Sequence, residues 1–428
     1  MSTHLDTHGD TRVPGGWRVL APFRFREYRL LIAALSISIF AEGMWAVVMA
    51  LQVMALADDP AALSLVAACL STGLVAFVLV GGIAADRISQ RSIIVAAQLM
   101  NTVTVGVVAA LGLTGQLRIW HMAVAAALLG VAAAFFFPAY SAYLPRILPA
   151  EHLLAANGVE GVVRPVLQRA LGPAVAGVLI GATFPTLGAV AVAAFFALGL
   201  VLLVVTGPAG DGSVPEPTGT GSDVLADLRA GFRFMVGTPW LLWTLLFASV
   251  FVLLVVGPIE VLLPFITAER FTDGARVYGL ALAAYGFGGA LGALGVASRR
   301  MPRRYLTTMM LMWGLGPPGL VLVGCTDSFP LMAAALFIVG ATDGGGMVIW
   351  GTLLQRRVPK EMLGRVSSLD FFVALAFMPV SMAIAGPLSK VVPVQVIFAV
   401  AGLAPLFLAA IALAAARMPH DEIAHPLR

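Results

Sequence analysis

The chain has 428 residues, of which 60% are hydrophobic and only 11% are charged. Soluble domains carry roughly 25% charged residues, so this composition excludes an ordinary soluble protein and predicts a polytopic membrane protein. The net charge of +4 does not indicate nucleic-acid binding, because arginines that flank apolar segments are explained by membrane topology. The two cysteines cannot form a disulfide framework, and we expect neither a metal nor a cofactor.

Apolar runs of about 20 residues, the length that crosses a bilayer as a helix, divide the chain into predicted spans. Twelve such runs are expected to begin near Leu30, Ala62, Ser92, Ile119, Val162, Thr186, Trp240, Val277, Tyr305, Phe329, Val366 and Val394. The first run is too long for the core of a signal peptide and should be retained as a span. We therefore expect an all-α membrane protein with twelve transmembrane helices.

The placement of Lys and Arg predicts the orientation of these spans, because both residue types accumulate on cytoplasmic loops. With both termini inside, the cytoplasmic segments hold 22 of the 26 Lys and Arg residues, Arg164 and Arg169 included. The remaining four are Arg118, Arg270, Arg276 and Lys390. This alternation predicts a multi-pass protein of the cytoplasmic (inner) membrane with both termini cytoplasmic.

A segment rich in Gly, Pro, Ser and Thr, Gly207 to Asp223, separates two similar halves. An amphipathic helix should follow it and either lie in the membrane interface or act only as a spacer. The halves resemble each other at an offset of about 210 residues, as in Pro149 and Pro359, which indicates two parallel six-helix repeats. The predicted organisation is a cytoplasmic tail 1–29, a bundle 30–206, a linker 207–238, a bundle 239–416 and a cytoplasmic tail 417–428.

The loop after the second predicted span has Gly82, Asp86, Arg87 and Arg91 in the spacing G-x-x-x-D-R-x-x-x-R. This pattern resembles the signature of the major facilitator superfamily at the same position. The stretches LRAGFRFMVGTPWL and LLQRRVPKEMLGRVSS resemble the branch that contains enterobactin exporters and macrolide efflux proteins. The resemblance implies two pseudo-symmetric six-helix bundles, alternating access and export of small molecules, commonly driven by proton antiport.

Two features depart from the drug antiporters of that superfamily. Many of them carry an arginine midway along the fourth span, roughly where this chain has Ala126. Their fifth-span motif is only partly matched here, by Gly172, Pro173 and Gly177. The resemblance implies that these three residues, like the loop from Gly82 to Arg91, belong to the gating machinery.

Asp86 is the candidate for a cytoplasmic latch between the halves. Its carboxylate could accept hydrogen bonds from the exposed N–H groups that open the eleventh helix near Gly364 to Ser368. Such a contact would have to break whenever the protein opens inward. The alternative is that Asp86 and Arg87 only mark a tight turn.

Three acidic residues lie within predicted spans: Glu42, Asp343 and Glu260. An ionised carboxylate at mid-bilayer costs about 2.5–3.5 kcal/mol on insertion scales, so these residues are candidates for proton coupling or substrate binding. They could instead be structural carboxyl groups, or bind a cationic cargo without carrying protons. Helical spacing adds a set of candidate cavity-lining residues: Trp45, Met49, Phe136, Tyr140, Met347 and Trp350.

The sequence lacks the motifs of a pump or a membrane enzyme. Its only lysines, Lys360 and Lys390, are not part of a phosphate-binding loop, and no H-E-x-x-H or G-x-S-x-G occurs. We therefore expect a monomeric secondary active exporter of small amphiphilic molecules, such as a drug-like compound or a siderophore, with a proton or else sodium as the coupling ion. An uptake permease, a lipid or siderophore carrier of the same fold, or a non-transporting membrane sensor are the alternatives.

Overall fold

The computed structural model describes residues 18–205, 224–359, 366, 370 and 376–427. Within these residues, eleven helical segments are long and apolar enough to cross a membrane. Each begins within about one helical turn of the position predicted from the sequence. The span predicted from Val366 is described mainly over the apolar helix α16 (Met378–Ser389). The all-α membrane fold is therefore confirmed.

The N-terminal bundle is built from six spans, the fifth of which is divided into two helices by a π-helical turn. A short 3-10 helix, Arg18–Arg24, precedes them. The elements are α1 (Arg26–Leu56), α2 (Pro60–Arg87), α3 (Gln90–Leu113), α4 (Ile119–Ile147), α5 (Ala150–Arg164), η2 (Pro165–Leu171), α6 (Gly172–Ala182) and α7 (Pro185–Val205).

The C-terminal bundle has the same organisation and is preceded by α8 (Val224–Gly237), where the sequence predicts an amphipathic helix. The first span of this bundle, which is the seventh of the chain, also contains a π-helical turn, η3. The elements are α9 (Pro239–Gly257), η3 (Pro258–Leu262), α10 (Leu263–Arg270), α11 (Gly274–Ala297), α12 (Tyr305–Leu315), α13 (Gly319–Cys325), α14 (Phe329–Arg357), α16 (Met378–Ser389), α17 (Val394–Ala415) and α18 (Met418–Ala424).

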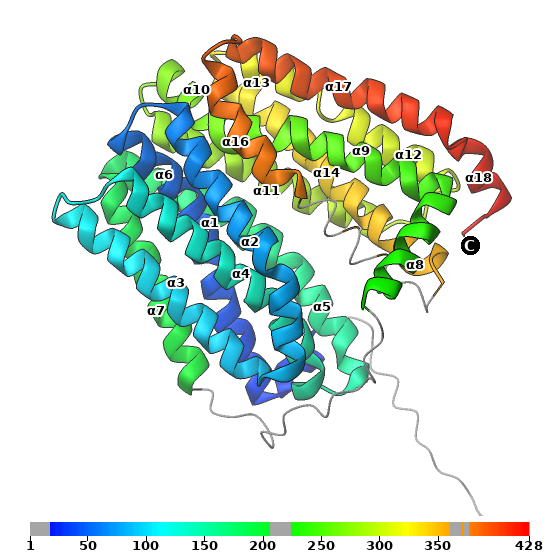
Figure 1. Ribbon diagram of the computed structural model, residues 1–428, viewed down its shortest axis with the longest axis horizontal. Helices are drawn as coiled ribbons and strands as arrows, with labels where there is room; N and C mark the ends of the chain where they lie inside the picture. Colours follow the sequence, from blue (N-terminus) through cyan, green and yellow to red (C-terminus); the bar gives the residue numbers. More distant parts are fainter. Residues whose placement is uncertain (1–17, 206–223, 360–365, 367–369, 371–375, 428) are drawn as a thin grey trace, which may run out of the picture.

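The two bundles meet along a seam and diverge at one end (Figure 1). Across the seam, α16 packs on α2, while α11 packs on α6 and η2. The side with the loops after α2, α4, α11 and α14 is called here the arginine-rich side. Near it, the main contacts of α5 and α14 are with elements of their own bundles. Among the described residues, the bundles are thus joined from mid-span to the opposite side, whereas on the arginine-rich side the helices mainly contact their own bundle.

Small residues allow the closest helix crossings inside each bundle. A Cβ atom added to Gly81 of α2 would lie 2.1 Å from the Ala134 carbonyl oxygen of α4, and one added to Gly292 of α11 would lie 1.9 Å from the Ala341 oxygen of α14. Only glycine permits backbones to approach this closely. The two crossings occupy corresponding places in the two bundles, whereas a Cβ on Gly82, the glycine that the sequence repeat pairs with Gly292, would meet nothing within 4 Å.

The C-terminal helix α18 is attached to the arginine-rich end of the second bundle. Glu422 is 1% exposed, and its carboxylate accepts hydrogen bonds from the backbone N–H groups of Leu306 (2.8 Å) and Thr307 (3.1 Å). These groups belong to the first turn of α12, where N–H donors have no partner within the helix. Beside it, Arg357 of α14 pairs with Asp421 and lies over the ring of Trp240. Helix α18 therefore connects α12 and α14.

We predict that Glu422→Gln lowers the thermal stability of the protein. The substitution replaces a buried charged acceptor by a neutral amide, whose oxygen can still accept from the two backbone N–H groups but binds them more weakly, which should cost about 1 kcal/mol. Thermal unfolding of the purified protein in detergent measures this effect. Glu269→Gln, at an exposed position in α10, is the matched control, and equal melting temperatures for the two variants would contradict the prediction.

Candidate functional site

The fifth span is interrupted near its middle by the π-helical turn η2. The Gly172 N–H closes this turn by donating to the carbonyl of Leu167, five residues earlier. Pro173 explains the interruption, because it has no N–H to donate to the carbonyl of Arg169. A π turn inserts one extra residue into a helix and is frequent at functional sites. As a result, the adjacent residues Gln168 and Arg169 reach partners in different bundles.

The seventh span repeats this arrangement in the other bundle. Its π turn η3 is closed by the Leu263 N–H, which donates to the Pro258 carbonyl, and Pro264 offers no donor to the carbonyl of Glu260. Glu260 and Arg169 therefore stand in equivalent positions, each inside a π turn and four residues before a proline.

Glu42 is held within the N-terminal bundle. The side-chain amide of Gln168 donates to its Oε2 at 2.8 Å. Glu42 is half-buried in the middle of α1 and interacts electrostatically with Arg164 of α5. Arg164 is already paired with Glu160, one turn away, at 2.9 Å. The carboxyl group of Glu42 thus has an uncharged hydrogen-bond donor as its direct partner.

Asp343 is the acid that contacts both bundles. The Tyr285 hydroxyl of α11 donates to its Oδ2 at 3.0 Å, and Nη1 of Arg169 lies 3.9 Å from the same oxygen. The side chain of Arg169 is 60% exposed although it lies mid-span, and that of Asp343 is 22% exposed. The two residues thus face each other across the seam, and neither side chain is fully covered by the protein.

Glu260 completes the set of acids around η2. Its electrostatic partner is Arg169, and within the described part of the chain its carboxylate makes no hydrogen bond. The fully buried hydroxyl of Tyr278 also lacks a hydrogen-bond partner there and interacts electrostatically with Glu260. The structure therefore brings the three predicted acids, Glu42, Glu260 and Asp343, around one turn of the fifth span.

Arg169 is the residue that the sequence-based interpretation misplaced. The topology prediction assigned Arg164 and Arg169 to a cytoplasmic segment, but both lie within the span Val159–Ala182, with Arg169 near its midpoint. The available signal was the charged residue four positions before Pro173, the spacing that also relates Glu260 to Pro264. Positive charges near a span end can be inside the bilayer when a partner compensates them.

The predicted cavity-lining residues occupy two environments. Met347, one turn after Asp343 on α14, is 55% exposed. The others are buried: Trp45 and Met49 belong to a core cluster formed by both bundles, whereas Phe136, Tyr140 and Trp350 pack in clusters within their own bundles. Trp350 donates from Nε1 to Asp370 at 3.1 Å. Trp45 has a buried indole N–H without a partner among the described residues.

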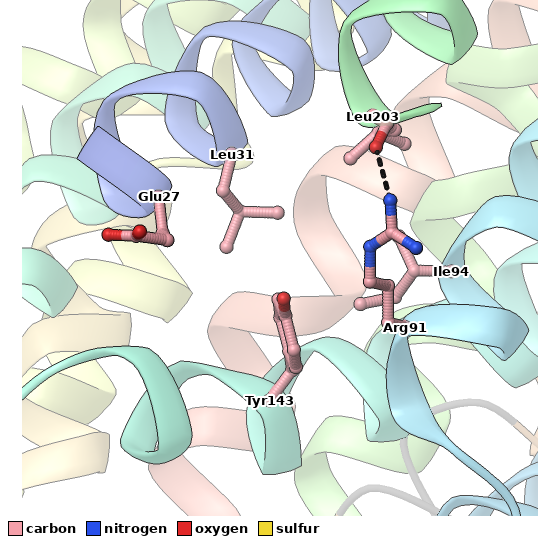
Figure 2. Close-up of a pocket in the computed structure, with 6 residues that line it drawn as sticks. All are labelled: Glu27, Leu31, Arg91, Ile94, Tyr143 and Leu203. Carbon is pink, nitrogen blue, oxygen red and sulfur yellow. Dashed lines mark hydrogen bonds between the residues drawn. The ribbon is translucent and has the colours of Figure 1, made fainter. Parts of the chain in front are cut away.

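The signature loop lies on the arginine-rich side between α2 and α3. Arg91 reaches the last turn of α7, where its Nη2 donates to the carbonyl of Leu203 at 3.0 Å, beside Glu27 and Tyr143 (Figure 2). A cation at this position satisfies carbonyls that lack intrahelical partners. Gly82 and Arg87 belong to the end of α2, and the predicted latch between Asp86 and residues 364–368 lies outside the described residues.

Gly172, Pro173 and Gly177 lie at the crossings of the fifth span with its neighbours. Gly172 touches the backbone of Gly43 in α1, whereas Pro173 and Gly177 touch Gly279 of α11 in the other bundle. The partial fifth-span motif therefore coincides with the places where α6 packs most closely, including the seam between the bundles.

A polar contact closes the seam on the side opposite the arginine-rich side. Lys390 Nζ donates to Asp59 Oδ2 at 2.9 Å, and the Gly386 N–H donates to Ser64 Oγ at 2.8 Å. The hydrogen bond from Lys390, followed by that from the backbone N–H of Ala61, holds the pKa of Asp59 below its usual range. These residues form the seal between α2 and α16.

Comparisons with known proteins agree with this architecture. The model of the Major Facilitator Superfamily matches residues 31–376. The chain belongs to the major facilitator superfamily. It is 29% identical over 378 residues to the multidrug efflux pump Tap of Mycolicibacterium fortuitum, covering 84% of this chain and 88% of that protein.

Two further similarities concern an exporter and a solved structure. The chain is 25% identical over 350 residues to the enterobactin exporter EntS of Escherichia coli O139:H28 (strain E24377A / ETEC), covering 80% of each. It also matches the structure of a bacterial homologue of the human lysosomal transporter Spinster with a TM-score of 0.65 and 14% identity, covering 96% of this chain and 99% of that one. The predicted family is confirmed, and the protein is a multi-pass membrane transporter.

We predict that Gly286→Ala destabilises the seam at η2. An added Cβ would lie 2.0 Å from the Arg169 carbonyl oxygen, so the helices must separate, at a cost of about 1–3 kcal/mol. Thermal unfolding in detergent measures the change. Gly295→Ala in the same helix, where a Cβ meets nothing within 4 Å, is the control and should melt like the wild type. Equal stability of both variants would exclude a close crossing at Gly286.

We predict that Asp59→Asn weakens the seal between α2 and α16. Because the pKa of Asp59 is lowered, the ion pair is present at neutral pH and is lost only as the pH falls through that lowered value. The distance between spin labels at the exposed positions Gln116 and Ser328 should therefore be longer in Asp59→Asn than in the wild type at neutral pH. In the wild type, the same distance should lengthen only at acidic pH. Asp58→Asn, at the exposed neighbouring position, should behave like the wild type, and identical distances in all three proteins would contradict the seal.

Proposed function

We propose that the protein exports small amphiphilic molecules across the cytoplasmic membrane by alternating access, driven by proton antiport. The observation that carries this proposal is the gathering of Glu42, Glu260 and Asp343 around η2, with contributions from both bundles. Acids at this depth are costly, so a transport role explains why they lie there. The similarity to a multidrug efflux pump and to an enterobactin exporter supports the direction and the class of cargo.

The distribution of contacts between the bundles supports alternating access. The seam is closed from η2 to the Asp59–Lys390 ion pair, while the bundles diverge on the arginine-rich side (Figure 1). Transporters of two repeated bundles can rock about a site near the bilayer midplane. In this proposal the conformation is open towards the arginine-rich side, and the seal between α2 and α16 opens when that side closes.

The proposed orientation has both termini in the cytoplasm of the cell. The arginines of the loops after α2, α4, α11 and α14 all lie on one side of the molecule, as expected for cytoplasmic loops. Moving Arg164 and Arg169 into the membrane leaves this asymmetry in place. A molecule in the cytoplasm would then reach Asp343 and Arg169 directly, and Asp86 would act on the cytoplasmic side as the proposed latch.

The carboxyl groups would couple the two fluxes by binding a proton and a cargo in turn. Glu42 has the amide of Gln168 as its donor, and Asp343 has the hydroxyl of Tyr285, so each acid keeps a polar partner when it gains a proton. Proton binding to an acid removes the charge that attracts a cation or a polar cargo. An exporter requires that the proton is taken from outside and released inside, where the cargo then binds.

We predict that Glu42→Gln and Asp343→Asn reduce transport driven by a pH gradient by about tenfold or more, because a neutral amide cannot carry the proton. Proteoliposomes with an imposed pH gradient and a panel of dyes, macrolides and catecholate siderophores measure the flux and its direction. Asp273→Asn, which removes an exposed acid at the start of α11, should leave the flux unchanged.

Two outcomes would contradict the proposal. Full gradient-driven flux in both Glu42→Gln and Asp343→Asn would exclude these acids as proton carriers. Accumulation of the cargo on the side from which the protein is proposed to remove it would exclude export and favour an uptake permease.

A further inference from the structure

The position of Arg169 needs an explanation that proton coupling alone does not give. The residue lies at mid-span, and its side chain is 60% exposed. Over the described residues it makes no hydrogen bond, and its nearest ionic partner is Asp343 at 3.9 Å. A positive charge at this depth costs a few kcal/mol, about 2.5–3.5 on insertion scales, and is normally retained only where it has a function.

The groups that interact electrostatically with Arg169 come from the C-terminal bundle. Asp343 of α14 and Glu260 of η3 lie across the seam, and Tyr285 of α11 contributes a hydroxyl. On its own side, Glu42 is bound by Gln168, while Arg164 is paired with Glu160. Three acids therefore surround η2, and among the described residues Arg169 is the cation there that has no acidic partner within its own bundle.

The fourth span provides no competing arginine. Ala126, at the position where the resemblance to drug antiporters would place one, is fully buried in α4. The π turn η2 instead delivers a central cation from the fifth span, directed across the seam to the other bundle. Its backbone is fixed by the contact between the Arg169 carbonyl and Gly286, so the side chain can leave Asp343 without movement of the helix.

We propose that Arg169 is a specificity-determining residue: a built-in cation that competes with the positively charged group of a cargo for Asp343. This inference rests on the proposed transport function of the same site. When the site is empty, Arg169 compensates Asp343. A cargo with a cationic nitrogen or phosphorus centre replaces the guanidinium at that carboxylate, whereas a neutral cargo leaves the pair in place.

Equilibrium binding of two probes to the purified protein in nanodiscs tests this inference without any gradient. Tetraphenylphosphonium is the cationic probe, and triphenylphosphine oxide is the neutral one. Removing the competitor in Arg169→Gln should tighten the binding of tetraphenylphosphonium about tenfold and leave that of the oxide unchanged. Arg169→Lys should bind both like the wild type, because a single contact at 3.9 Å requires the charge and not the planar fork of arginine.

Two further variants separate a charge effect from a structural one. Asp343→Asn should change the affinity for tetraphenylphosphonium in the opposite direction, weakening it about tenfold without affecting the oxide. It therefore tests the inference even where Arg169→Gln does not fold. Arg276→Gln, which removes an exposed arginine of α11, should bind both probes like the wild type.

The inference is overturned by any of three results: equal changes for both probes, no change for either in Arg169→Gln and Asp343→Asn, or no binding of tetraphenylphosphonium to any variant. Because binding is measured at equilibrium, its outcome is independent of whether a pH gradient drives flux in proteoliposomes. Selective binding without gradient-driven flux would refute antiport and retain the role of Arg169. Gradient-driven flux together with equal binding changes for both probes would refute the role of Arg169 and retain antiport.

Discussion

A charge in the middle of a bilayer requires a compensating group, and in this protein the two bundles provide compensating groups to each other. Arg169 comes from the N-terminal bundle, while Asp343 and Glu260 come from the C-terminal bundle. Their attraction acts across the seam near mid-span, at the end of the region in which the two bundles contact each other. Any change in the charge of one partner, by a proton or by a bound cation, therefore changes the interaction between the bundles themselves.

Two prolines explain why these charges can reach each other. Pro173 and Pro264 have no N–H to donate to the carbonyl of the residue four positions earlier. In each helix a π turn lies directly before the proline. The fifth and seventh spans belong to different repeats and do not occupy equivalent places in them. The chain thus uses the same local device twice to position one cation and one acid on opposite sides of the seam.

The sequence predicted the fold well because the fold depends on length and hydropathy. Twelve apolar runs, the repeat and the signature from Gly82 to Arg91 were sufficient for the family, and the family model confirms it. The three acids were found because their charge contrasts with an apolar background. Arg169 was missed because it was assigned, together with Arg164 five residues earlier, to a cytoplasmic segment, where positive residues usually gather. Burial of Trp45 and Trp350 could not be predicted either, since helical spacing places a residue on a face without showing what covers that face.

Alternating access requires that the bundles enclose a water-filled space at mid-membrane depth that opens to one side at a time. Met347 is exposed one turn from Asp343, so a thiol introduced at this position reports on that space most directly. In a protein without Cys69 and Cys325, the Met347→Cys variant should react with a hydrophilic, membrane-impermeant thiol reagent from the arginine-rich side, and the reaction should slow when cargo is present. A thiol that reacts from neither side, or only with lipid-soluble reagents, would show that this face meets lipid and would contradict the account.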